Sequence, residues 1–567
     1  MKPLYRAYIY RVVAGMALLP AGVSTAWAQV VLPPAPGFDP GQMQERLSVP
    51  QTLPPVDATP AKPAEAPPPS TAGSDITFTL TSLTIEGATA FSQDDLRSDY
   101  QQYLGTTISL ATLNDIADKI TVRYRNAGYI LSRAVIPQQR IEGGNVTIRV
   151  VEGYVSNVEF SGLEEGEKPG LVADMAAHIT EDKPLNAKTL ERYLLLMQDL
   201  PGEGARAILK PSEVEGGGAD LVIAVTHKAI DATGTVDNRG TRYVGPTQFG
   251  LTASANNQLG WYERTQVHGV LTGENNELHY GQITHEEMLD SDGTKLSLSY
   301  SHTNSHPSFK LRPFDIESQD NDYSAAVSHP FQRSRTANFY TTGTIEVRET
   351  AADALGTELY QDRLRVLRVN NAYDFVDDGA AVNRISSTLS KGLGWNDDSA
   401  NMRRSRGNGR PDFFKAEAQA SRLQPIDSSF NFYAAASGQM SADTLLASEE
   451  FALGGTSFGS AYDPSELSGD SGAAVRAELQ YNREGDWSVV PTYQLYSFWD
   501  YGKVWQRDIP GARDQPSLAS AGFGLRFNAD VPLSGGLEFA MPLTKYVTAN
   551  GADGRAPRAF FSLMYRY

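Results

Sequence analysis

The chain ends in Phe560-Phe561-Ser562-Leu563-Met564-Tyr565-Arg566-Tyr567, a stretch in which two kinds of side chain alternate. Aromatic or apolar residues occupy every second position up to Tyr567, and Ser562, Met564 and Arg566 lie between them. Successive side chains of a β-strand point to opposite faces, so this strand would have one apolar face. An apolar face opposite a mixed face is typical of a strand in a transmembrane β-barrel.

The same alternation recurs upstream, back to about residue 231. Apolar residues alternate with serines in 296–301, and with Gly524 and Arg526 in 523–527. Helical periodicity is almost absent here, and Asn, Asp and Gly residues separate the segments. A soluble β-sandwich is the alternative, but it does not suit so long a region without a second core. At roughly 21 residues for each strand with its share of turn, residues 231–567 predict an all-β outer-membrane barrel of about 16 strands.

One connection in this region is far longer than an ordinary turn. Residues 451–479 read FALGGTSFGSAYDPSELSGDSGAAVRAEL, which is rich in Gly and Ser and contains Pro464. This composition indicates a loop, and a loop of this length in a compact domain is usually functional or disordered. Its glycine pairs and the residues Tyr462 and Asp463 favour a loop with a defined shape.

Two motifs in this loop resemble those of serine hydrolases. Residues 455–459 match G-x-S-x-G, and 469–472 read Gly-Asp-Ser-Gly. The first motif needs a following helix and a downstream His, but the last His of the chain is His329. The second needs a triad with upstream partners, which no sequence context suggests. We therefore predict no catalytic residues and no enzyme activity.

The beginning of the chain has the features of a secretory signal peptide. Basic residues precede an apolar run over 12–23, and Ala26-Trp27-Ala28 fits the cleavage pattern. A membrane anchor is the alternative, but the run is shorter than the roughly 20 residues that a spanning helix needs. We expect a signal peptide over 1–28, followed by a Pro-rich linker over 29–75.

The composition limits the possible partners and cofactors. The chain has no cysteine and its eight histidines are scattered, so we predict no metal site and no cofactor. The net charge of −18 argues against a nucleic-acid partner, because such proteins present a basic face.

Residues 76–153 and 154–230 share a different plan. In the first segment we expect a strand at 78–85, helices at 92–103 and 109–127, and strands at 129–136 and 146–151. The second segment repeats this βααββ order, with a helix stopped by Pro201-Gly202. Two α+β modules therefore precede the barrel.

Several motifs together resemble those of the two-partner secretion transporters, the TpsB or haemolysin secretion/activation proteins. Residues 120–130 (ITVRYRNAGYI), 136–139 (IPQQ) and 150–153 (VVEG) are similar to the first POTRA module of that family, of the ShlB type. The segment 154–230 would be POTRA 2. The long loop and the F-x-D-x-G segment at 498–502 are similar to its sixth barrel loop and its facing wall.

The resemblance implies site residues. The loop would enter the pore and contact the barrel wall at Asp500 and Gly502. The expected pore-loop residues are Gly454, Gly455, Ser460, Tyr462, Asp463, Gly469, Asp470 and Gly472. Ser460 stands where the family usually has an arginine that pairs with the wall aspartate. This predicts a loop held less rigidly, unless Tyr462, Asp463 or Arg526 anchors it, and a tolerated Ser460→Arg substitution.

In the first POTRA module the second strand would be a sheet edge that receives cargo as an added strand. The expected cargo-binding residues are Tyr129, Ile130, Leu131, Ser132, Arg133, Ala134, Val135 and Ile136. Residues 41–47 could form a plug helix in the pore.

The resemblance implies that the chain would export and thereby activate one large unfolded exoprotein of the haemolysin or adhesin class. It would do so as a monomer in the lipids of the outer membrane, with its POTRA modules in the periplasm. The alternative is an outer-membrane protein assembly factor of the same superfamily, which typically has more POTRA modules. A passive porin would need none.

Overall fold

A computed structural model describes residues 39–48, 54–56, 76–162, 170–212, 216–273, 277–394, 403–487, 490–507 and 516–567. The expected signal peptide and most of the linker lie outside these residues. Among the described residues, no helix is both long enough and apolar enough to cross a bilayer.

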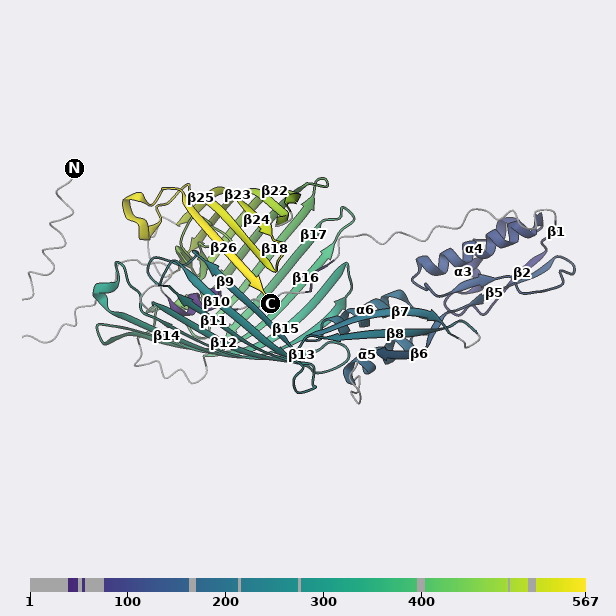
Figure 1. The fold of residues 1–567 in the computed structure, drawn as a ribbon, viewed down its shortest axis with the longest axis horizontal. Coiled ribbons are helices and arrows are strands. Elements are labelled where there is room, and N and C mark those ends of the chain that lie inside the picture. Colours follow the sequence, from purple (N-terminus) through teal and green to yellow (C-terminus); the bar gives the residue numbers. More distant parts are fainter. Residues whose placement is uncertain are drawn as a thin grey trace, which may run out of the picture. The chain divides into compact units, whose positions relative to one another are not determined.

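Sixteen strands from β9 to β26 form a closed antiparallel barrel, which confirms the predicted fold class. Neighbours in sequence pair with each other, and β26 pairs with β9 to close the ring (Figure 1). The strands are β9 (Ile230–Asp237), β10 (Gln248–Asn256), β11 (Glu263–Thr272), β12 (Leu278–Met288), β13 (Lys295–Ser305), β14 (Ile316–Arg333), β15 (Ala337–Ala354), β16 (Thr357–Val376), β17 (Val382–Gly392), β18 (Phe414–Pro425), β19 (Phe430–Ser441), β22 (Ser471–Trp487), β23 (Val490–Trp505), β24 (Ser517–Asn528), β25 (Leu533–Pro542) and β26 (Arg558–Arg566). We call the end of the barrel at which β9 begins the proximal end, and the opposite end the distal end.

Side chains alternate between the two faces of the barrel wall. On β15, Ile345 is 50% exposed on the outside, whereas Glu346 and Arg348 are buried inside the ring. On β16, likewise, Leu367 is exposed on the outside and the charged side chain of Arg368 faces the inside. An apolar exterior around a charged interior is the arrangement that a bilayer requires of a barrel.

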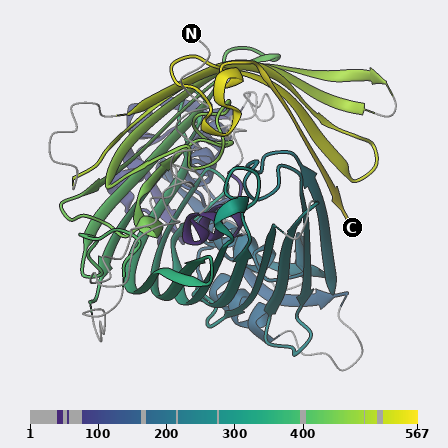
Figure 2. The same cartoon turned by 90° about the vertical axis from the view of Figure 1, so that its left-hand side faces the viewer.

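The lumen contains helix α2 (Pro40–Leu47), which Figure 2 shows in purple inside the ring of strands. Asp39 caps its first turn by accepting a hydrogen bond from the Gln42 backbone N–H at 3.1 Å. Gln42 Nε2 donates to the Ala447 carbonyl at 2.8 Å, and Arg46 Nη1 to Gln248 Oε1 at 3.2 Å. The helix therefore contacts both the barrel wall and the loop that follows β19.

The first module contains the expected βααββ elements, but the helix expected at 92–103 is shortened to residues 93–97 followed by a 3-10 turn, and two of its strands differ from the prediction. Its sheet has the order β2-β5-β4, and its elements are β1 (Thr77–Thr79), β2 (Ser82–Glu86), α3 (Gln93–Arg97), a 3-10 turn (Gln101–Tyr103), β3 (Thr107–Ser109), α4 (Leu110–Asn126), β4 (Arg133–Val135) and β5 (Asn145–Val151). The strand expected at 78–85 is interrupted, because the fully buried Leu80 separates β1, which pairs with β3, from β2. Ser109 caps α4 by accepting the Thr112 N–H, and Gly128 ends it at a φ of 98°.

The second of these strands is the one expected at 129–136. Only Arg133–Val135 form a strand, because Gly128 to Ser132 make a turn. The Ile130 N–H donates to the Gly128 carbonyl at 3.0 Å, and the Ser132 N–H to the Tyr129 carbonyl at 3.1 Å.

The second module repeats the plan with β6 (Tyr154–Ser161), α5 (Gly170–Glu181), α6 (Ala187–Gln198), β7 (Glu203–Pro211) and β8 (Gly218–His227). Its sheet has the order β6-β8-β7. Met175, Ile179, Leu196 and Ile223 lie in one core between the helices and the sheet.

Candidate functional site: the pore loop and its wall

Residues 442–470, which we call the pore loop, connect β19 to β22 at the distal end. The loop contains a 3-10 turn (Ala447–Glu449) and a hairpin of β20 (Phe451–Leu453) with β21 (Leu467–Gly469). The sequence predicted a loop over 451–479, but Gly472 pairs with Gln439 in the barrel ladder. Residues 471–479 are therefore wall, and the loop begins before 451.

The hairpin packs closely on the wall because two wall residues are glycines. A Cβ on Gly502 would lie 2.6 Å from a methyl group of Leu453. A Cβ on Gly472 would lie within 2 Å of the Phe451 ring. Any larger residue at either position would push the hairpin off the wall.

The tip of the loop turns back on itself at glycines with positive φ. Gly454 and Gly455 have φ of 115° and 91°, and a Cβ on Gly454 would lie 2.0 Å from the Asp463 carbonyl oxygen. The Gly455 N–H donates to the Tyr462 carbonyl at 3.2 Å. The G-x-S-x-G match at 455–459 thus serves a tight turn that only glycine accommodates.

Asp500 on β23 lies at the centre of the contact between tip and wall. Its side chain is fully buried and accepts hydrogen bonds from the Ser460 backbone N–H, at 3.1 Å, and from the Ser520 hydroxyl. Arg526, one of the predicted partners, lies elsewhere: its guanidinium contacts Glu478 at 3.2 Å and stacks on the Tyr496 ring.

The cation near Asp500 comes from the wall strand β22. Arg476 is the register partner of Asp500, and its Nη1 lies 3.5 Å from Asp500 Oδ2. The same nitrogen donates to the Ser460 hydroxyl, and Nη2 contacts Glu478 Oε1 at 2.7 Å. A wall arginine therefore occupies the place at which the family resemblance suggested a loop arginine, and it binds both the tip and Asp500.

Further contacts hold the tip, including two that the sequence predicted as alternatives. The Tyr462 hydroxyl donates to the Ala519 carbonyl at 3.2 Å and accepts the Lys545 N–H at 3.1 Å. Asp463 Oδ1 pairs with Arg558 Nη2 at 2.6 Å.

Arg239, whose role the sequence did not reveal, also holds the tip. It donates to the Ser460 carbonyl at 3.1 Å and pairs with Glu538 at 2.8 Å. The tip of the loop is thus fixed by contacts to several strands rather than by one ion pair.

The expected cargo edge on the first module is short and partly covered. β4 is the edge strand of the sheet, but the Ala134 N–H donates to Thr121 Oγ1 of α4 at 2.9 Å. Ser132 is buried and its hydroxyl accepts the Gly153 N–H at 3.1 Å. Ile130 is exposed beside the edge.

A half-buried carboxylate joins the segments at one end of this module. Glu152 accepts hydrogen bonds from the Thr89 and Ala90 N–H groups, at 2.7 and 2.9 Å, and from the Tyr124 hydroxyl at 2.8 Å. Burial alone would raise the pKa of Glu152, but these hydrogen bonds outweigh it and lower the pKa below its ordinary value.

Comparisons with known proteins agree with this architecture. The family model described as haemolysin secretion/activation protein ShlB/FhaC/HecB matches residues 217–527, and the model of the ShlB-type POTRA domain matches 78–153. The heme/hemopexin transporter protein HuxB of Haemophilus influenzae strain 86-028NP is 20% identical over 77% of this chain and 78% of its own. The outer membrane transporter CdiB of Escherichia coli O6:K15:H31 is 22% identical over 71% and 69%.

Among solved structures, CdiB from Escherichia coli is similar in fold. It superposes with a TM-score of 0.70 over 90% of this chain and 94% of its own, at 21% identity.

Proposed function

The chain belongs to the haemolysin secretion/activation protein family ShlB/FhaC/HecB, and from this we infer that its pore loop and helix α2 close, at rest, an export channel for one exoprotein. The protein is an outer-membrane transporter of two-partner secretion and not an enzyme. Its POTRA modules lie in the periplasm, so the distal end of the barrel faces the cell exterior.

The observation that supports this proposal is the charged lumen, which holds two elements that are not part of the barrel wall. Polar side chains of the wall face inward, and α2 and the pore loop lie among them. An unfolded chain with exposed backbone groups could pass such a lumen, whereas it could not cross the lipid outside it. The cargo would therefore be an extended exoprotein of the haemolysin or adhesin class. A monomer suffices, because a closed barrel leaves no free strand edge.

A disulfide between the loop and the wall tests whether the loop must move. The close approach of Leu453 to the Gly502 Cβ position suits a disulfide between cysteines at both places, and the chain has no other cysteine. We expect the oxidised Leu453→Cys/Gly502→Cys barrel to export no exoprotein and the reduced barrel to recover export. The single Leu453→Cys variant is the control, because a cysteine at 502 beside the native Leu453 would itself displace the hairpin. Normal export through the oxidised barrel would contradict loop movement.

For cargo recognition we propose the edge at 129–136, with the exoprotein adding to β4 after the Ala134 N–H leaves Thr121. Ala134→Pro removes this donor without touching the ladder to β5, and should reduce export from assembled barrels. Thr121→Val releases the same donor and should preserve export. Equal loss in both variants, or no loss in Ala134→Pro, would count against this edge.

A further inference from the structure

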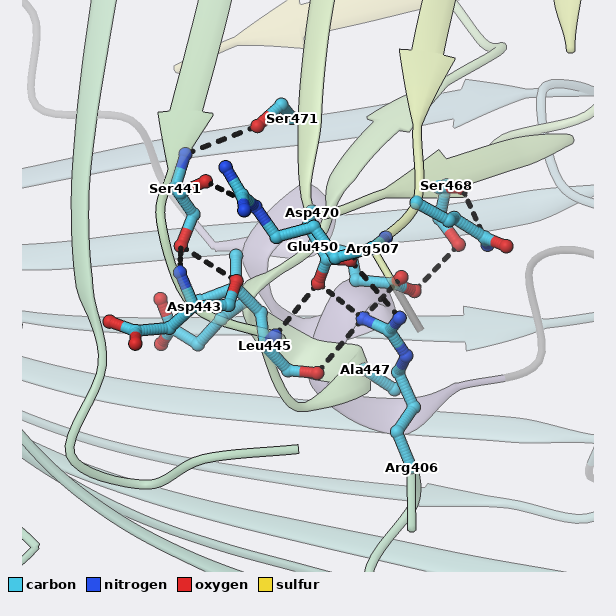
Figure 3. A network of polar contacts seen from close by, with 12 residues as sticks. Arg406, Ser441, Asp443, Leu445, Ala447, Glu450, Ser468, Asp470, Ser471 and Arg507 are labelled. Carbon is cyan, nitrogen blue, oxygen red and sulfur yellow. Dashed lines mark hydrogen bonds and ion pairs between the residues drawn. The ribbon is translucent and has the colours of Figure 1, made fainter. Parts of the chain in front are cut away.

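A single arginine from another distal loop joins both legs of the pore loop. Arg406 lies in the connection between β17 and β18, of which residues 393–394 and 403–413 are described. Its Nη1 lies 2.5 Å from Asp470 Oδ1 and 2.8 Å from Glu450 Oε1, and donates to the Leu445 carbonyl at 2.9 Å (Figure 3). Glu450 immediately precedes β20 and Asp470 immediately follows β21, so the guanidinium bridges the start and the end of the hairpin.

Asp470 connects a third loop to the same point. It is fully buried and accepts the backbone N–H of Leu445 at 2.7 Å and that of Arg507 at 2.9 Å. Arg507 follows β23, and its Nε donates to the Ser441 carbonyl at 2.9 Å. Three distal loops therefore meet at one carboxylate, which Figure 3 shows at the centre of the network.

The segment that carries Arg406 is itself attached to the wall. The neighbouring Ser405 donates through its backbone N–H to Asp362 of β16 at 3.0 Å, and its hydroxyl accepts the Ala447 N–H at 3.1 Å. The Gln361 N–H of the same strand donates to the Arg403 carbonyl at 2.8 Å. The arginine thus reaches the pore loop from a fixed support rather than from a free chain.

The buried charges around Arg406 indicate its role in holding the hairpin. Glu450 and Asp470 are both buried, and two carboxylates facing one another without a cation repel strongly at low dielectric. Removing one partner of a buried ion pair costs far more than removing an exposed one, because the remaining charge stays unpaired. Without Arg406, the legs of the hairpin would be driven apart.

We propose that Arg406 is a positioning residue that clasps the two legs of the pore loop and so sets the resting place of its tip in the lumen. This rests on the proposed function in assuming that the tip closes the channel. The clasp acts at the distal end and is separate from the contacts of Asp500 with the tip.

The test measures the position of the loop and the closure of the channel separately. Ala461 is buried at the tip, so a cysteine placed there reacts with a bulky maleimide only after the tip leaves the wall. Conductance of the purified full chain in planar bilayers reports closure. Arg406→Gln should speed the labelling of Ala461→Cys about tenfold and raise conductance.

Three further variants assign the effect to charge. Arg410 lies on the same loop and also contacts the pore loop, at 3.3 Å from Asp443, but it is half-exposed, so Arg410→Gln should label like the parent. Arg406→Lys keeps a charge without bridging all partners and should label at an intermediate rate. Adding Glu450→Gln to Arg406→Gln removes the repulsion and should slow the labelling again.

The outcomes separate the two claims. Unchanged labelling in heat-modifiable, assembled Arg406→Gln barrels, or equal acceleration in Arg410→Gln, would overturn the clasp. Faster labelling with unchanged conductance would support the clasp and contradict closure by the tip. If Arg406→Gln does not assemble, the same comparison is made with Arg406→Lys, for which labelling at the parent rate would overturn the clasp.

Discussion

Replacing Arg476 by glutamine should release the pore-loop tip from the barrel wall. The side chain is 94% buried, and its guanidinium donates to the Ser460 hydroxyl while facing Asp500 at 3.5 Å and Glu478 at 2.7 Å. The substitution leaves the other tip contacts in place, since Arg239 still reaches the Ser460 carbonyl.

The size of the effect follows from the contacts that are lost. A hydrogen bond to a charged group contributes about 1.5–3 kcal/mol. Arg476 donates to the loop twice, to the Ser460 hydroxyl and, at 3.4 Å, to the Thr456 carbonyl. The loss of the shorter bond alone should raise the population of the displaced tip roughly 10- to 150-fold. The barrel itself should lose about 3–5 kcal/mol of stability, because Asp500 remains buried without its cation.

The assay is maleimide labelling of Ala461→Cys in assembled barrels, with heat-modifiability on gels as the check of assembly. Arg363→Gln serves as the control, because this wall arginine is partly exposed and lies 3.7 Å from Glu349. A labelling rate equal to that of the parent in folded Arg476→Gln barrels would show that Arg476 does not hold the tip.

Three other outcomes follow from the structure. Ser460→Arg should reduce export, because residue 460 is fully buried and faces the Arg476 guanidinium. The sequence alone predicted that this substitution would be tolerated, and export at the parent level would favour that expectation. The lowered pKa of Glu152 means that its carboxylate stabilises POTRA 1 above pH about 4.3 and that this stability is lost as the pH falls through the folded-state pKa. Glu152→Gln should therefore weaken hydrogen-exchange protection in the module at pH 7 and flatten its acid dependence, whereas an unaltered pH profile would exclude this role. Protease added to intact cells should spare residues 76–230. Cleavage there would contradict the predicted orientation of the barrel.

The fold could be predicted because a barrel in a membrane imposes a pattern on every strand. Each strand needs an apolar outer face and a polar inner one, so the alternation at 523–527 and in the last strand is visible without structure. The hydrophobic stripe of α4 was equally clear, and Leu113, Ile116 and Ile120 do form the core of POTRA 1.

The partner of Asp500 could not be predicted, because strand register decides it. Arg476 lies 24 positions away in sequence and becomes a neighbour only through the pairing of β22 with β23. An arginine at an inward position of a strand was the available indication. The edge strand at 129–136 was predicted too long, because Tyr129 and Ile130 favour strands locally while the positive φ of Gly128 makes a turn there.

The most direct test of the central claim is to crosslink the exoprotein to the barrel during export. The exoprotein is identified as the large protein that disappears from the medium when the gene for this chain is deleted. A folded domain fused to the end of the exoprotein then arrests it in transit. Thr344 lines a 440 Å³ cavity of the lumen, whereas the next residue, Ile345, faces outward. In a chain without other cysteines, Thr344→Cys should crosslink to the arrested exoprotein and Ile345→Cys should not. Crosslinking at Ile345→Cys alone, or at neither position with export intact, would contradict passage through the lumen.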